Sequence, residues 1–211
     1  PFFATVGVAA GLVLAAAPLP VPAFAASAKA SSAWAYADQS VADFYRARGD
    51  RPLWYGTEGR QVDVLLELLD SAEIDGLDPK RYRIGAIQKA VRSARKGDRR
   101  AVQRADMLLS NALVAYARDV RRSGAATETI YVDPELKPAA PSPRAILEAG
   151  ACPPSLGDYV ARLGWMHPMY GELRHALMLG FYDKGQRQRI MVNLDRAREL
   201  PGMGRRHVLV N

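Results

Sequence analysis

The chain has 211 residues, with 29 lysines and arginines against 22 aspartates and glutamates, and a net charge of +7 at pH 7. Its single cysteine excludes a fold held together by internal disulfides, so folding must depend on the burial of apolar side chains. The basic excess suggests anionic surroundings such as wall polymers or membrane surfaces, and nucleic acid is the other usual partner of a basic protein. Because acidic residues are interleaved with the basic ones, a solvated helical surface also explains the charge.

The first 28 residues carry no charge. An apolar stretch over residues 2–17 is followed by three prolines and then by Ala23, Phe24 and Ala25, which is the layout of a secretory signal peptide with a small-x-small cleavage site. We therefore expect residues 1–25 to be a signal peptide, cleaved between Ala25 and Ala26. An uncleaved membrane anchor is the alternative, since the stretch is long enough to span a bilayer, but its prolines and alanines weaken that interpretation. The start at Pro1, without Met or a basic leader, suggests a chain cut at this end.

Two helices are predicted in the next forty or so residues. Over residues 31–48, Val41, Phe44 and Tyr45 recur at i, i+3 and i+4, and Gly49 follows in the position of a C-terminal cap. Pro52, Leu53 and Trp54 form a turn with two buried anchors. A second helix is expected over residues 61–71, with an apolar face formed by Val62, Leu65, Leu66 and Leu69.

The segment 74–79, with the sequence IDGLDP, is predicted to be a polar loop. Its Asp75 and Asp78 faintly resemble a calcium loop, but the alternating ligands and the terminal bidentate Glu are missing. A turn that carries Leu77 into the core is the better interpretation.

Two further helices follow, at residues 83–96 and from a cap at Asp98 to about Arg122. The second has a broad apolar stripe, which makes it the expected central core helix. Its stripe consists of Val102, Ala105, Leu108, Leu109, Ala112, Leu113 and Tyr116.

Residues 123–154 contain six prolines, which leave room for one short helix at 145–149. This segment is expected to wrap over the helical core or to link two halves of it. Helices at 156–163, 168–181 and 186–200 complete the set, so the predicted fold class is mainly α, with a helical domain over residues 31–200. A break at residues 201–204 precedes a strand at 205–211, which has no partner to pair with. We expect this strand to lead into a β-rich domain beyond residue 211.

Three groups of residues are candidates for chemistry, and each has a plainer explanation. Cys152 sits in a proline-rich loop without an adjacent His, Ser or Arg to activate it, which favours an ordinary loop residue over a nucleophile. His167 and His175 are eight residues apart, whereas a helical metal pair is usually at i and i+4, so partly buried or surface histidines are favoured. Most of the aromatic residues fall at helical spacing or beside Pro, which favours core packing over stacking on sugars or bases. They are Trp34, Tyr36, Phe44, Tyr45, Trp54, Tyr55, Trp165, Tyr170, Phe181 and Tyr182.

The residues thus predict an exported helical domain with no catalytic, cofactor-binding or metal-binding residue. Taken together, several blocks in the sequence resemble the N-terminal scaffold region of the large murein L,D-transpeptidases, across nearly all of the chain after residue 30. The blocks are residues 41–54, 74–79 with Tyr82, 106–116, 170–174, 193–198 and 206–211.

The resemblance implies a parent enzyme of the bacterial periplasm that crosslinks peptidoglycan stem peptides through a cysteine thioester. It also implies that residues 205–211 are the first strand of the catalytic domain. The Ser-His-Gly-Cys type motif of that domain is absent from this chain, and Cys152 matches it in neither context nor position. The expected partners are peptidoglycan and the missing catalytic domain. Nucleic acid is not expected, and the membrane is expected only through the signal peptide during export.

One feature of the sequence leaves an alternative open. Many relatives carry a peptidoglycan-binding module between the last two scaffold helices, but here residues 182–186 join these helices directly. A stand-alone, non-catalytic helical protein that binds the cell wall or a partner is therefore the competing hypothesis.

Overall fold

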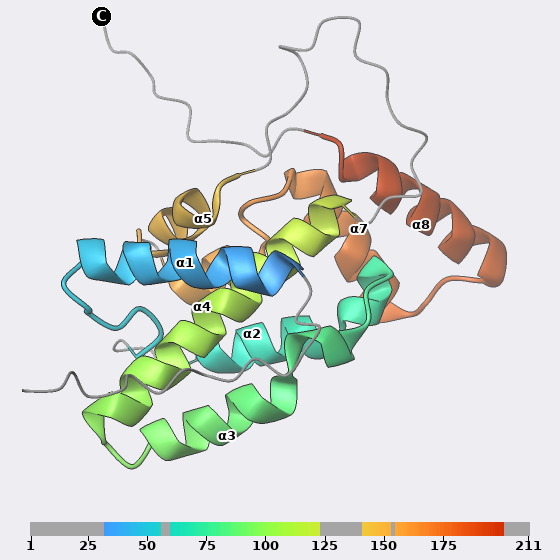
Figure 1. Cartoon of the computed structure of the whole chain (residues 1–211). Helices are drawn as coiled ribbons and strands as arrows, with labels where there is room; N and C mark the ends of the chain where they lie inside the picture. Colours follow the sequence, from blue (N-terminus) through green and yellow to red (C-terminus); the bar gives the residue numbers. More distant parts are fainter. Residues whose placement is uncertain (1–31, 56–59, 123–140, 153–154, 201–211) are drawn as a thin grey trace, which may run out of the picture. The chain divides into compact units, whose positions relative to one another are not determined.

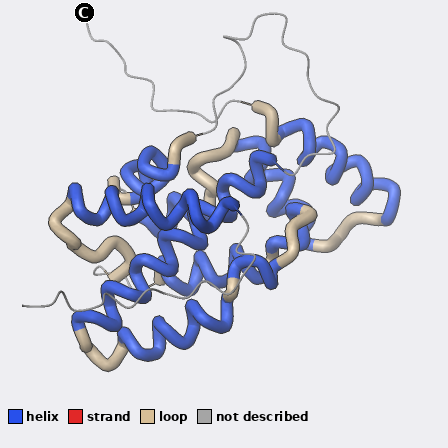
Figure 2. Tube along the Cα trace, in the orientation of Figure 1, coloured by secondary structure: helices blue, strands red, loops and turns tan. Residues whose placement is uncertain are grey.

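The computed structural model of the protein describes residues 32–55, 60–122, 141–152 and 155–200. The chain divides into two units, residues 1–30 and 31–211, and all described residues belong to the second. They form eight α-helices and two short 3-10 helices, with no strand among them (Figures 1 and 2). The predicted mainly α class is therefore confirmed. The predicted signal peptide, its cleavage site at Ala25 and the strand 205–211 lie outside the described residues.

Helix α4 (Arg99–Arg122) is the core of the fold, as its apolar stripe predicts. It packs against α3 (Ile84–Ala94) along one side and against α1 (Ser32–Ala47), which crosses it in Figure 1. Its side chains are buried over most of its length, including Leu109, Leu113 and Tyr116, none of which is exposed. Because α4 contacts so many neighbours, it positions most of the polar groups described below.

Two shorter helices close the core on the side of α2 (Gln61–Asp70). Helix α6 (Leu156–Ala161) packs on α2, and α5 (Pro143–Gly150) contacts α1, α4 and α6. Both begin at a serine, Ser142 and Ser155, whose hydroxyl accepts a backbone N–H of the first turn. These N-caps fix the helix starts beside the proline-rich stretch.

The region predicted as the loop 74–79 is more regular than expected. It contains η1 (Ala72–Asp75) and η2 (Pro79–Tyr82), the second of which is capped by Asp78. Gly76, with φ +69°, ends η1 in a left-handed conformation that glycine adopts without strain. Leu77 is buried, as predicted. Asp75 is buried as well, and the sequence does not predict this.

The last two helices, α7 (Pro168–Leu179) and α8 (Lys184–Ala197), form a hairpin. Helix α7 ends two residues before the predicted Phe181, because Gly180 turns the chain with φ +71°. Helix α8 starts two residues before the predicted Gln186, because Asp183 and Gln186 form a capping box. Phe181 and Tyr182 are exposed in the connection, so the prediction of core packing was wrong for these two aromatics.

No helix among the described residues is long and apolar enough to cross a membrane.

Candidate functional site

The most concentrated polar chemistry of the described fold surrounds the carboxylate of Asp75, at the end of η1. This side chain is fully buried and accepts four hydrogen bonds. The hydroxyl of Tyr116 donates to Oδ2 at 2.6 Å, and that of Tyr170 donates to Oδ1 at 2.6 Å. The Nε of Arg174 lies 3.1 and 3.0 Å from the two oxygens. Three segments far apart in the sequence therefore meet at one carboxylate.

Arg174 supplies the charge that balances Asp75 in the core. Its side chain is 7% exposed, and its Nη2 also donates to the carbonyl and hydroxyl oxygens of Ser71, at 3.2 and 2.7 Å. Burial alone would lower the pKa of Arg174, but Tyr116 and Asp75 outweigh it and raise that pKa above its ordinary value. The guanidinium therefore stays charged.

The two tyrosines stay neutral hydroxyl donors. Burial, followed by the charge of Asp75, raises the pKa of Tyr116 and of Tyr170 above the ordinary value for tyrosine. Neither phenol is poised to lose a proton near neutral pH, so their role is to donate hydrogen bonds to the carboxylate.

Arg198, just after α8, completes what we call the Asp75 cluster: Asp75, Tyr116, Tyr170, Arg174 and Arg198. Its Nη2 donates to the backbone carbonyl of Asp75 at 2.7 Å, and its Nη1 donates to the carbonyl of Val120 at 2.9 Å. The guanidinium also lies 5.6 Å from the centre of the Tyr170 ring. The cluster therefore joins η1, α4, α7 and the end of α8.

A pocket of about 170 Å³ lies beside this cluster, lined by η1 and α8. The carboxylate of Asp75 is not exposed to it, and its oxygens are occupied by the donors above. The cluster is consequently built to hold helices together, and no group in it is arranged as a general base or a nucleophile.

A second buried group, which we call the Asp106 cluster, consists of Tyr45, Trp54, Asp106 and Ser110. The two carboxylate oxygens of Asp106 accept the backbone N–H groups of Leu53 and Trp54, at 2.9 and 2.8 Å. The Oγ of Ser110 accepts the indole N–H of Trp54 at 2.8 Å and lies 2.8 Å from the hydroxyl of Tyr45. The turn after α1 is thus fixed on α4 by side chains of α4.

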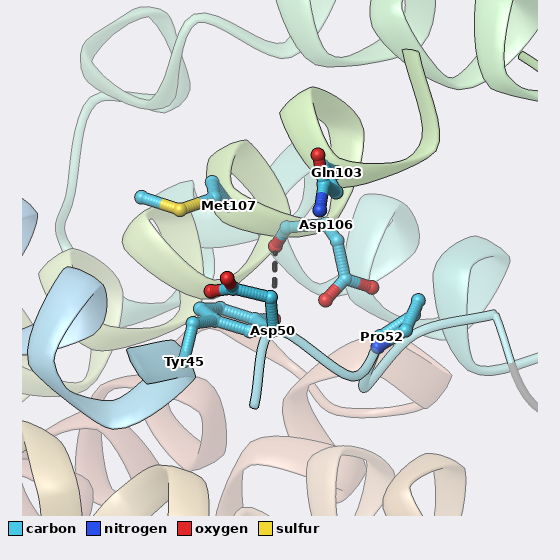
Figure 3. A pocket seen from close by; sticks show the side chains of 6 residues that line it. All are labelled: Tyr45, Asp50, Pro52, Gln103, Asp106 and Met107. Atoms are coloured by element: carbon cyan, nitrogen blue, oxygen red, sulfur yellow. Dashed lines mark hydrogen bonds between the residues drawn. The ribbon is translucent and has the colours of Figure 1, made fainter. Parts of the chain in front are cut away.

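A pocket of about 200 Å³ lies next to the Asp106 cluster. Figure 3 shows the side chains that line it. Gln103, Asp106 and Met107 from α4 face Tyr45, Asp50 and Pro52 across it. Burial raises the pKa of Asp106 above the ordinary value, although its backbone donors oppose that effect. Because both carboxylate oxygens bind backbone, this carboxyl also has a positioning role.

The residues considered as a nucleophile or as metal ligands, Cys152, His167 and His175, have ordinary structural surroundings. Cys152 is a free, half-buried thiol that follows α5, and its N–H donates to the carbonyl of Ala149 at 3.3 Å. His167 caps α7 through Nδ1, which accepts the N–H of Met169 at 3.2 Å, while His175 is exposed on α7. Among the described residues, no group of three potential metal ligands occurs.

Sequence reasoning missed both clusters. Asp75 was interpreted as part of a turn, and the charges near Arg174 and Arg198 as a solvated surface. A usable signal existed in one place: Tyr170 and Arg174 are four residues apart, so they share one face of α7.

Comparison with known families assigns the chain to one of them. The family model described as "Scaffold domain" matches residues 39–177, more than half of the chain. No curated protein and no solved structure matches the chain. The matched region runs from α1 into α7 and contains the Asp106 cluster and all of the Asp75 cluster except Arg198. On this match, the chain belongs to the Scaffold domain family.

Proposed function

We propose that this chain is the scaffold portion of an exported L,D-transpeptidase. In the parent enzyme, a catalytic cysteine elsewhere forms a thioester with a donor stem peptide, and an acceptor amine then attacks it to crosslink peptidoglycan. The observation that carries the proposal is the match to the Scaffold domain family over residues 39–177. The assignment to the L,D-transpeptidases in particular is supported by the blocks of the sequence that resemble the scaffold of these enzymes.

The geometry at the end of α8 supports a role as a platform. Arg121 of α4 donates to the carbonyls of Arg198 and Leu200, each at 3.0 Å, and to that of Trp165 at 2.9 Å. These bonds fix the chain just before residues 201–211, where the sequence predicts the linker and the first catalytic strand. A catalytic domain that starts there would begin from a defined point on the scaffold.

Export is the second part of the proposal, and it rests on the uncharged segment 1–25. A reporter enzyme that is active only outside the cytoplasm, fused after residue 30, should be active in cells. Retention of the reporter in the cytoplasm would contradict export and with it access to peptidoglycan.

The first experiment on activity compares the 211-residue chain with the protein encoded by the longer reading frame. We expect the coding sequence after Asn211 to continue into a β-rich domain with a Ser-His-Gly-Cys motif, and the longer protein to form crosslinks between stem peptides, detected by mass spectrometry. The chain of 211 residues should form none.

Matched cysteine variants assign the chemistry. In the longer protein, replacement of the motif cysteine by alanine should abolish crosslinking, while Cys152→Ser should retain it. Crosslinking by the 211-residue chain that is lost in Cys152→Ser would overturn the proposal, as would a stop codon followed by unrelated sequence.

The net charge of +7 favours one other candidate, a stand-alone protein that binds the cell wall. Sedimentation with purified peptidoglycan sacculi tests it. Salt-sensitive binding by the 211-residue chain, together with a stop codon after Asn211, would support this alternative over the scaffold of a transpeptidase.

A further inference from the structure

The exposed apolar side chains of the described fold are concentrated in the α7–α8 hairpin. Phe181 is 84% exposed and therefore contacts almost nothing, and Met178 is 52% exposed. All large hydrophobic residues exposed among the described residues lie between positions 169 and 192. Four of these follow one another closely, at the end of α7 and in its connection to α8, and we call them the hairpin patch: Met178, Leu179, Phe181 and Tyr182. Such a concentration on one part of a fold marks a surface that binds something.

Basic residues flank the patch. Over residues 178–192 the sequence has three cations, Lys184, Arg187 and Arg189, and one carboxylate, Asp183. All three cations belong to exposed residues, and Asp183 is engaged as the N-cap of α8, accepting the N–H of Gln186 at 2.8 Å. The partner of this surface should therefore combine apolar contact with negative charge.

The patch lies where α7 ends and the chain turns toward α8 (Figure 1), and three kinds of partner can be compared for it. A second copy of the chain would oppose like charges. An anionic polymer would neutralise the cations but offer no apolar medium for Phe181. The surface of a bilayer with anionic lipids offers both, because aromatic and apolar side chains enter the boundary between headgroups and acyl chains while Lys and Arg stay at the headgroups.

We propose that the α7–α8 hairpin docks on an anionic phospholipid bilayer, with Phe181 and Tyr182 entering the interface and Lys184 and Arg189 at the headgroups. This goes beyond the expectation from the sequence, which limited membrane contact to the signal peptide. It is also independent of the transpeptidase assignment, because it uses only the hairpin.

The test needs a probe at the hairpin itself, since residues 1–25 can also associate with lipid. The full chain is labelled with an environment-sensitive fluorophore at position 181, by Phe181→Cys in a Cys152→Ser background. The matched control carries the label at Ala86→Cys, an exposed position on α3. Each protein is mixed with vesicles of neutral phosphatidylcholine alone or with phosphatidylglycerol.

With anionic vesicles we expect the emission from position 181 to shift to the blue and to be quenched by lipids that carry a quencher at the upper acyl carbons. The label at position 86 should not respond. The double variant Lys184→Gln and Arg189→Gln should raise the lipid concentration for half-maximal response by roughly tenfold to thirtyfold.

Several results would overturn the proposal. One is the absence of a shift at position 181 with anionic vesicles, and another is an equal shift with neutral ones. A shift that depends on protein concentration without lipid would assign the patch to self-association. A response to an acidic amphipathic peptide but not to vesicles would assign it to a protein partner.

Discussion

The hydroxyl of Tyr116 lies 2.6 Å from Oδ2 of Asp75, although the two residues are 41 positions apart. This bond connects the middle of α4 to the end of η1. The hydroxyl of Tyr170 binds the other oxygen of the same carboxylate from α7. The free energy of the fold should therefore depend on Asp75 more than on any exposed carboxylate.

Replacement of Asp75 by Asn should be strongly destabilising. The variant leaves Arg174 buried without its counter-charge, which costs about 3–5 kcal/mol for a buried ion pair broken on one side. Urea denaturation followed by circular dichroism measures the loss. The matched control is Asp43→Asn, which breaks the exposed ion pair with Arg46 and should cost less than about 1 kcal/mol. Equal losses in the two variants would show that Asp75 is not a centre of stability.

The two tyrosines should act together. Tyr116→Phe and Tyr170→Phe each remove a hydrogen bond to a charged acceptor, at a cost of about 1.5–3 kcal/mol. Because both bonds end on Asp75, the double variant should deviate from additivity by more than about 0.5 kcal/mol in a double-mutant cycle. Tyr182→Phe, at an exposed position, should have little effect. Strict additivity would indicate that the two hydroxyls do not share an acceptor.

Asp106 should leave a signature in the pH dependence of stability. Because burial raises its pKa in the fold, the folded state binds more protons than the unfolded state between the unfolded pKa, about 4, and the raised pKa. The contribution of Asp106 to the free energy of unfolding therefore falls as the pH rises through this window, and is constant above it.

The measurement is the difference in free energy of unfolding between the wild type and Asp106→Asn, from pH 4 to pH 8. Titrations of the other carboxyls cancel in this difference. The free energy of unfolding of the wild type minus that of Asp106→Asn should be largest at the acidic end of this range and level off toward neutral pH. A difference that grows with pH would mean that the pKa of Asp106 is lowered in the fold.

Arg121 should control the local stability of the end of α8. Arg121→Met removes the donors to the carbonyls of Arg198, Leu200 and Trp165. Loss of the two bonds to Arg198 and Leu200 from a charged donor should speed amide hydrogen exchange near residues 198–200 by at least roughly tenfold, without a matching change in α3. Arg122→Met, at the exposed neighbouring position, is the control. If amide exchange became faster by the same factor in all helices, the substitution would have lowered the global stability of the fold rather than the local stability of the end of α8.

The sequence predicts the helices of this fold well where one physical rule dominates. The stripe from Ala105 to Tyr116 identifies α4 because its apolar residues recur with the helical period. The prediction for the last helix missed the start because the capping box of Asp183 and Gln186 begins the helix two residues earlier, ahead of the apolar positions. Helical spacing places Phe181 in the core at the end of a predicted helix over residues 168–181, but Gly180 ends α7 in a left-handed conformation and Phe181 is exposed.

The buried polar clusters could not be predicted in the same way. Patterns of hydrophobicity assign Arg174 and Arg198 to the surface, since charged residues are rarely buried unless they are paired. The carboxylate that permits the burial of Arg174, Asp75, comes from a segment 99 residues earlier, and no local period connects the two. Arg198 has a local ion pair with Asp195 at 3.0 Å, but its bond to the backbone carbonyl of Asp75 spans 123 residues. Only the packing of η1 between α4, α7 and the end of α8 brings them together.

Both polar clusters draw on α4, Asp106 in one and Tyr116 in the other. These two residues are ten positions apart, which corresponds to about 15 Å along a helix axis, so the covalent length of α4 sets the separation of the two clusters. One residue inserted between Asp106 and Tyr116 would rotate Tyr116 by about 100° and carry its hydroxyl away from Asp75, while the Asp106 cluster stayed in place. Variation in chain length should therefore be tolerated in the connections around α4 and not within this stretch of the helix.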